Sequence, residues 1–208
     1  MDETHIINKV VLRGTLFEPP HFSHKSREEC FFQFPLEIGR LSGTSDIVNI
    51  VARESLINEL EVSEKLKLSV VGELRSFNSK SIGGPKLIIT VFAREIFFDD
   101  GEDINRIELS GTLCKPTNLR ITPMGREICD IMLAVNRHYG RSDYLPCIAW
   151  GSRAKDTAEW TVGTMIRLDG RIQSRKYIKN IDGNSVEKTA YEVSVVNIER
   201  ETPEIFAE

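Results

Sequence analysis

The sequence repeats itself at an offset of 97 residues, and this duplication constrains the fold more than any other feature. The segment Asn8–Leu16, NKVVLRGTL, aligns with Asn105–Leu113, NRIELSGTL. The same alignment continues through three further pairs of segments: 36–40 with 133–137, 46–52 with 143–149 and, after one extra residue, 72–76 with 170–174. The 208 residues therefore contain two copies of one fold of about 100 residues each, a comfortable size for a domain.

Alternating apolar and polar residues predict the strands of each copy. In the second copy we expect strands at 106–113, 127–135, 144–150, 165–173 and 190–198, with turns at Pro123-Met124-Gly125 and Asp182-Gly183. A helix is expected over 152–160, with Ser152 as its N-cap and Gly163 as its terminator. The first copy repeats this order, with strands at 10–16, 31–38, 47–53, 66–74 and 87–96, a helix near 54–60 and a turn at Gly83-Gly84-Pro85.

Three strands, a helix and two more strands are the order of the OB-fold, a five-stranded Greek-key barrel with one short helix between strands three and four. We therefore predict an all-β chain of two tandem OB-folds. The predicted boundaries are 1–98 for the first fold, 99–103 for a short acidic linker, 104–200 for the second fold and 201–208 for a short acidic tail.

Charge is distributed unevenly over these segments. Residues 1–103 carry 12 Lys and Arg against 17 Asp and Glu, a net charge of −5. Residues 104–200 carry 15 against 11, a net charge of +4, and the tail carries three Glu. The net charge of −4 for the whole chain is an average over unlike segments, so long-range attraction to a polyanion is expected from the second copy alone.

Six segments of the second copy carry a resemblance to a known family. They are NRIELSGTL (105–113), LRITP (119–123), LAVNR (133–137), CIAWG (147–151), GRIQSRKY (170–177) and the pair Asp182-Gly183. In these segments the second copy resembles the bacterial single-stranded DNA-binding protein family, and the first copy is a diverged tandem copy. In that family an OB-fold holds single strands by stacking bases on aromatic side chains. The resemblance places four such positions on Tyr139, Tyr144, Trp150 and Tyr177.

The residue types by themselves favour the same chemistry, because every base has a π-face and every phosphate a negative charge. Tyr139 lies between arginines in NRHYGR (136–141), and Tyr177 ends a basic run in the last hairpin. The candidate phosphate contacts are Arg137, Arg141, Arg171, Arg175, Lys176 and Lys179. For Tyr144 and Trp150, a purely structural role in the core or at the rim of the strand stays open.

The first copy departs from this pattern. Ser42, Ile47, Arg53 and Ser79 stand where the second copy has its four aromatic residues, and only Phe77 nearby offers a ring to a base. We therefore expect the first copy to have a weak or altered nucleic-acid role, or to serve in pairing and partner contacts.

Other chemistries lack their motifs. Cys30, Cys114, Cys129 and Cys147 have no C-x-x-C spacing and are interpreted as buried small apolar residues, not as disulfides or zinc ligands. His21-Phe-Ser-His24 is expected in a loop and has no second ligand pair, so neither a metal nor another cofactor is predicted. Nucleotide-binding glycine motifs and the paired carboxylates of nucleases are absent, so no catalytic residue and no enzyme activity are predicted.

Neither a membrane-spanning segment nor a secretory signal is predicted from the sequence. No apolar run reaches the roughly 18–20 residues that span a bilayer. The acidic N-terminus lacks the features of a secretory signal. We therefore expect a cytoplasmic, nucleoid-associated location.

The resemblance implies a non-enzymatic protein that coats and protects single-stranded DNA without strong sequence preference, in replication, recombination or repair. Because the family commonly assembles four OB-folds, a chain with two is expected to form a homodimer. The end, ETPEIFAE, places Phe206 after an acidic stretch, and either recruitment of replication or repair proteins or a frayed terminus fits it. The alternative functions are an OB-fold protein–protein adaptor of the primosome-accessory type with weak nucleic-acid binding, and single-stranded RNA binding.

Overall fold

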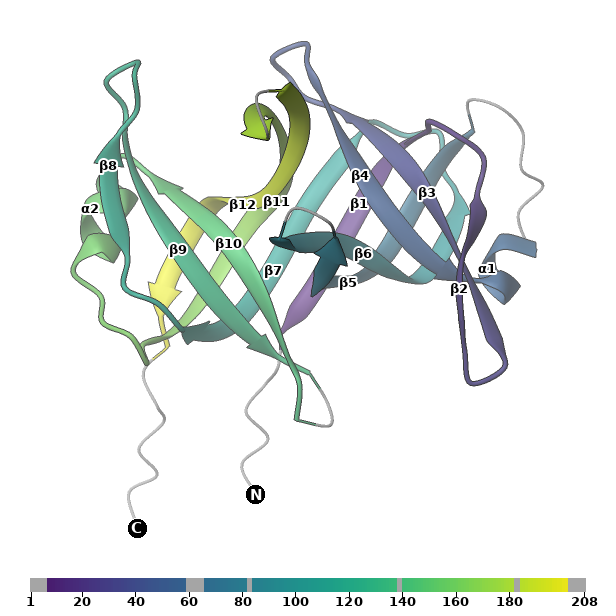
Figure 1. The fold of residues 1–208 in the computed structure, drawn as a ribbon, viewed down its shortest axis with the longest axis horizontal. Helices are drawn as coiled ribbons and strands as arrows, with labels where there is room; N and C mark the ends of the chain where they lie inside the picture. Colours follow the sequence, from purple (N-terminus) through teal and green to yellow (C-terminus); the bar gives the residue numbers. More distant parts are fainter. Residues whose placement is uncertain (1–6, 59–65, 82–83, 138–139, 182–183, 202–208) are drawn as a thin grey trace. The chain divides into compact units, whose positions relative to one another are not determined.

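A computed structural model of the chain describes residues 7–58, 66–81, 84–137, 140–181 and 184–201. In this part of the chain the two halves contain the same elements in the same order (Figure 1). The first half contains β1 (Asn8–Leu16), β2 (His21–Ser26), β3 (Glu29–Gly39), β4 (Ser45–Arg53), α1 (Glu54–Asn58), β5 (Lys67–Ser81) and β6 (Gly84–Phe98). The second contains β7 (Ile104–Leu113), β8 (Asn118–Ile121), β9 (Glu127–Asn136), β10 (Ser142–Trp150), α2 (Ser152–Ala158), β11 (Met165–Ile181) and β12 (Asn184–Arg200).

Each half closes into a barrel. In the first half the hydrogen-bonded order is β2-β3-β4-β6-β5-β1, and an additional pairing of β3 with β1 closes the barrel. The second half has the order β7-β11-β12-β10-β9-β8, and β7 pairs with β9 to close it. In both barrels the strand before the helix pairs in parallel with the last strand, β4 with β6 and β10 with β12. These are two tandem OB-folds, as the sequence predicts.

A glycine in the first strand of each copy permits this closure. A Cβ on Gly14 would lie 2.2 Å from the carbonyl oxygen of Glu37, and one on Gly111 would lie 2.5 Å from that of Ala134. Both carbonyls belong to the strand that closes the barrel, and no real Cβ approaches an oxygen so closely. The glycine of the repeated G-T-L motif is therefore required by the close approach of two strands.

Every second residue of the strands fills the barrel interior. In the first barrel these include Leu12, Phe34, Leu36, Ile50 and Leu74, and in the second Ile107, Leu109, Leu133, Leu145 and Leu168, all essentially without exposure. Burying each such side chain contributes roughly 1.5–3 kcal/mol. Because side chains alternate along a strand, the intervening residues lie on the outer face of the barrel.

Two short strands were not predicted from the sequence. The segment from His21 to His24, expected as a loop, lies in β2, which pairs with β3, and β8 pairs with β9 in the same way. Almost every residue of these edge strands is exposed, so neither shows the alternation that marks a half-buried strand.

The last two strands of each copy are longer than predicted. β5 extends to Ser81, because its residues continue the antiparallel ladder with β6, and β11 extends to Ile181. Gly84 and Pro85, expected in a turn, lie in β6, where Pro85 is in register with Lys80. The turn at Pro123-Met124-Gly125 is confirmed, with Gly125 at φ +76°. Asp182-Gly183 lies outside the described residues.

The second helix starts and ends differently from the prediction. Gly151, at φ +60°, is the N-cap of α2, so the prediction of Ser152 as N-cap is wrong, and no side chain caps the helix. The helix ends with Glu159 as C-cap, before Gly163. Gly163 instead has φ +95° in a following turn, where its N–H donates to the carbonyl of Leu113 at 2.9 Å.

The four cysteines are free thiols. Cys129 and Cys147 are buried as expected, whereas Cys30 and Cys114 are partly exposed, so the expectation of burial is wrong for these two. Cys30 lies at the start of β3, beside the exposed strand β2, and Cys114 follows the end of β7, where the barrel interior no longer covers a side chain.

The acidic segment 99–103 is anchored to residues of the first copy. Asp99 pairs with Arg13 at 2.5 Å, and Asp103 pairs with Lys67 at 2.7 Å and accepts the backbone N–H of Gly39 at 2.6 Å. The segment thus belongs to the same compact unit as the first barrel, which comprises residues 9–107 together with residues 172–191 of the last hairpin. The boundaries at 98 and 104 stay a prediction. No helix among the described residues is long and apolar enough to cross a membrane.

Candidate nucleic-acid interface

Strand β10 places two of the predicted aromatic residues on the outer face of the second barrel. Asp143, Leu145, Cys147 and Ala149 are at most 1% exposed and point inward, so the intervening residues, which include Tyr144 and Trp150, point outward. Tyr144 is 51% exposed. Six residues of strand separate it from Trp150, which corresponds to about 20 Å at the rise of a β-strand.

Trp150 is held in a fixed orientation. Its ring is half-buried, and its indole N–H donates to the hydroxyl of Ser194 on β12 at 3.2 Å. Ser194 is in register with Ile148, two residues before Trp150 on β10. Because the polar edge of the indole already has its hydrogen bond, the apolar face of the ring is the part that a ligand can contact.

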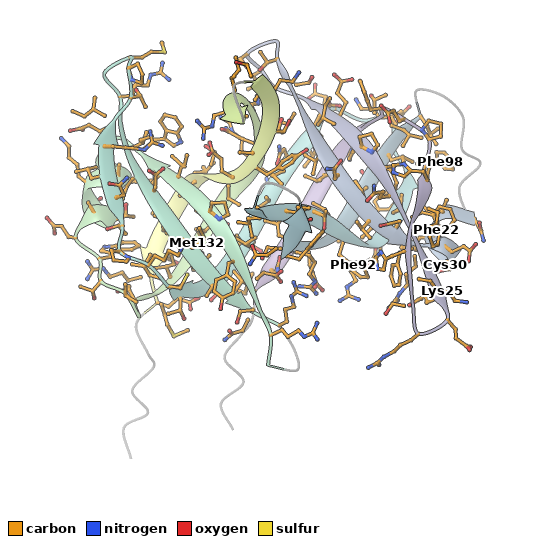
Figure 2. All side chains as sticks on the ribbon, in the orientation of Figure 1. Phe22, Lys25, Cys30, Phe92, Phe98 and Met132 are labelled. Atoms are coloured by element: carbon orange, nitrogen blue, oxygen red, sulfur yellow. The ribbon has the colours of Figure 1, made fainter. Side chains whose placement is uncertain are left out.

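Apolar side chains fill the surface between the two aromatic residues. Met132 on β9 (Figure 2) is in register with Pro146 on β10, and Ile148 lies two residues further along. Ala134, opposite Tyr144, is too small to cover the tyrosine ring. The outer face of β9 and β10 thus presents Tyr144, Pro146 and Met132, whereas Ile148 is buried and the carboxylate of Asp130 lies opposite it.

Arg120 on β8 adds a cation that the sequence did not predict. It is in register with Ile128, which in turn is in register with Trp150, so all three lie across one face of the sheet. Its guanidinium binds Asp130 at 2.6 and 3.0 Å, and this hydrogen bonding raises the pKa of Arg120 further. The residue was missed because β8 itself was not predicted. The signal available in the sequence was its place in LRITP, one of the segments that carry the family resemblance.

Arg137 is engaged in a buried ion pair. Its Nε donates to Asp143 at 2.6 Å, and its terminal nitrogen donates to the other carboxylate oxygen. Asp143 has no exposed side-chain surface, whereas the arginine side chain is 25% exposed. The same bidentate pair joins Arg40 and Asp46 in the first barrel, with the same exposures. The geometry therefore gives Arg137 a structural task, joining β9 to β10.

The remaining predicted residues divide into exposed and undescribed ones. Arg141, Arg171, Arg175 and Lys176 are exposed, Arg141 before β10 and the others along β11. Tyr139 lies outside the described residues, as does Phe206. Tyr177 and Lys179 lie in β11, but their side chains are outside the description. The structure thus brings Trp150 together with the unpredicted Arg120 and places Tyr144 on the same outer face, about 20 Å further along β10. It leaves the role of the loop and hairpin residues a prediction.

The protein thus has two OB-folds in tandem, and the second displays the rings of Tyr144 and Trp150 and the cation of Arg120 on its outer strands. Residues 104–200 match the model of the single-strand binding protein family. This segment is similar to that family, and the resemblance predicted from the sequence is confirmed.

Curated relatives match part of the chain and part of their own length. Single-stranded DNA-binding protein 2 of Listeria innocua is 37% identical over 90 residues, which cover 40% of this chain and 56% of the relative. The single-stranded DNA-binding protein of Oceanobacillus iheyensis is 34% identical over 100 residues, covering 45% and 59%. The chain therefore spans little more than half the length of these relatives.

A solved structure extends the likeness to both barrels. The single-stranded DNA-binding protein from Thermus aquaticus superposes with a TM-score of 0.76 and covers 94% of this chain and 93% of its own. Its sequence identity is 21%, so the comparison establishes the shared fold of the two halves.

Proposed function

We propose that the chain binds single-stranded DNA without strong sequence preference and shields it during replication, recombination or repair. The observation that carries the proposal is the outer face of β10, where Tyr144 is half-exposed and Trp150 is fixed by Ser194. The names of the relatives, all single-stranded DNA-binding proteins, support the same function.

In this mechanism bases stack on the rings and cations neutralise phosphates. Each stacked base contributes roughly 1–3 kcal/mol, and any base can occupy the site because all have a π-face. Tyr144 and Trp150 supply the described rings, and Tyr139 and Tyr177 extend the surface in the proposal. Phosphate contacts are assigned to Arg141, Arg171, Arg175, Lys176 and Lys179, whose removal is expected to weaken the salt dependence of binding.

The proposal describes binding, not catalysis. Stacking and ion pairing make and break no covalent bond, so the proposed protein is not an enzyme. We place its action in the cytoplasm, on DNA of the nucleoid. We further propose a homodimer with four OB-folds, which sedimentation at micromolar concentration tests: a clean monomer would refute the dimer without affecting DNA binding.

Tryptophan fluorescence tests the proposed function directly. The chain has two tryptophans, so Trp160→Phe leaves Trp150 as the sole reporter. Titration of this variant with oligo(dT) is expected to quench its fluorescence, and added salt is expected to reverse the quenching. If neither quenching nor an anisotropy change of labelled oligo(dT) occurs, the proposal is wrong.

Tyr144→Ala separates stacking from the adaptor function. The substitution removes an exposed ring, so it is expected to lower oligo(dT) affinity about tenfold with little change in stability. If wild type and Tyr144→Ala bind oligo(dT) equally weakly, the result would favour the alternative function, an OB-fold adaptor that binds proteins and has weak affinity for nucleic acid. A parallel titration with oligo(U) decides between DNA and RNA.

A further inference from the structure

The first barrel has aromatic residues at the place where the second barrel has Trp150, but on the neighbouring strands. On β4, Arg53 occupies the position of Trp150 and is in register with Phe31, as Trp150 is with Ile128. On the last strand, Phe92 is in register with Val51, as Ser194 is with Ile148. The set of Ile128, Trp150 and Ser194 is therefore replaced by Phe31, Arg53 and Phe92.

The two phenylalanine rings lie side by side under more exposed groups. Their centroids are 6.0 Å apart, and Phe31, at 8% exposure, is almost fully covered. The imidazole of His24 on β2 stacks on Phe31 with centroids 4.8 Å apart and planes within 8°. A bulge between Phe22 and His24 brings His24 into register with Phe31 and so onto this outer face.

A guanidinium covers the other ring. Arg94 on β6 lies over Phe92, with its central carbon 4.9 Å from the ring centroid. Its Nε donates to Glu73 at 3.0 Å, and its side chain is still 44% exposed. His24 and Arg94 thus present planar, exposed groups, each backed by a phenylalanine (Figure 2 labels Phe92).

The local charge of this face differs from that of the segment to which it belongs. Three arginines, Arg53, Arg75 and Arg94, are ion-paired with the carboxylates of Glu29 and Glu73. This group of side chains therefore carries a positive excess within a segment whose net charge is −5. Planar groups together with excess cations match a nucleic-acid strand better than an apolar protein surface.

We propose that this face of the first barrel is a second base-stacking site, in which His24 and Arg94 contact bases of single-stranded nucleic acid. The proposal rests on the proposed function, since it assigns a further site for the same ligand. Bases stack on the imidazole and guanidinium planes, and the phenylalanines beneath hold these planes in place.

The test uses the full chain and a double variant. His24→Ala/Arg94→Ala removes both exposed planes and leaves the rings beneath. Its affinity for oligo(dT), measured by anisotropy, is expected to fall at least tenfold. Arg94→Lys in the His24→Ala background keeps the charge and removes the guanidinium plane, so it is expected to show most of the same loss.

Lys25→Ala is the matched control. Lys25 lies on the same hairpin, is exposed and is in register with Cys30, on the face opposite to His24. Its removal costs one positive charge and is expected to change affinity less than twofold. A loss equal to that of the double variant would overturn the stacking site, because it would reduce the effect to net charge.

The outcomes separate this inference from the function on which it rests. If wild type fails to bind oligo(dT), the proposed function is refuted. If wild type binds, Tyr144→Ala weakens binding and the double variant does not, only the second site is refuted. If the double variant leaves DNA affinity intact and changes the sedimentation of the protein, the face is a protein interface and the inference is also refuted. Circular dichroism melts verify that the variants fold.

Discussion

Replacing Arg137 with alanine separates a structural role from phosphate binding. The sequence suggests a phosphate contact, whereas the structure pairs this arginine with Asp143 through two hydrogen bonds. The two partners differ in exposure: the side chain of Asp143 is fully buried, and the side chain of Arg137 is 25% exposed. The effect of a substitution therefore depends on which partner is left behind.

The magnitude follows from this asymmetry. Arg137→Ala leaves the Asp143 charge buried without its cation, and such changes cost about 3–5 kcal/mol. Asp143→Asn leaves a guanidinium that water already reaches, so its cost is expected to be lower, about 1–3 kcal/mol. Removing both charges in Arg137→Met/Asp143→Leu is expected to cost less than Arg137→Ala alone, because no unpaired charge stays inside.

Urea unfolding of the three variants, with Arg141→Ala as the exposed control, measures these differences. Arg141→Ala is expected to change the free energy of unfolding by less than about 0.5 kcal/mol. The structural role would be refuted if Arg137→Ala unfolded at the wild-type midpoint. If the same variant also reduced the magnitude of the slope of log affinity against log salt by about 0.7, Arg137 would be assigned to a phosphate contact instead.

Three further predictions concern stability and reactivity. Hydrogen bonds from Gly101 N–H and the Ser69 hydroxyl, with the Arg13 ion pair, lower the pKa of Asp99 below its ordinary 3.8. Its contribution is thus complete above pH 3.8 and lost as the pH falls through the lowered pKa, so Asp99→Asn is expected to flatten acid unfolding monitored by fluorescence. Gly111→Ala is expected to lower the free energy of unfolding by about 1–3 kcal/mol, in urea melts, because its Cβ would overlap a carbonyl. Burial raises the pKa of the Cys147 thiol, so in a timed thiol titration of the native protein it is expected to react only on unfolding.

The repeat made most of the fold predictable. Alternation located the barrel strands, because half of each strand faces a mostly apolar interior such as that around Leu12 and Leu145. It failed for β2 and β8, which are exposed on both faces and exist because they pair with a neighbouring strand. Pairing between strands is a tertiary interaction, and a local pattern does not contain it.

The site was predictable in part for a similar reason. The outward direction of Tyr144 and Trp150 follows from alternation along β10, but the bond from Trp150 to Ser194 joins strands that are 44 residues apart. The structural role of Arg137 did have a signal in the sequence. Both Arg137 and Asp143 recur in the first copy, as Arg40 and Asp46, although that copy lacks the family's aromatic residues.

The two copies therefore act as controls for each other. Residues that both retain, such as the Arg–Asp pair and Gly14 with Gly111, serve barrel geometry, because that geometry is what the copies share. Side chains on the outer strands are not constrained by closure and have diverged. In the second barrel the ring is Trp150 on β10, beside Ser194 on β12. In the first barrel Arg53 stands on the equivalent strand β4, and the ring is Phe92 on the last strand β6. His24 and Arg94 cover the phenylalanine pair of the first barrel, and such contacts stabilise a barrel whether or not it binds bases, so the affinity of the double variant decides whether this face is a second site.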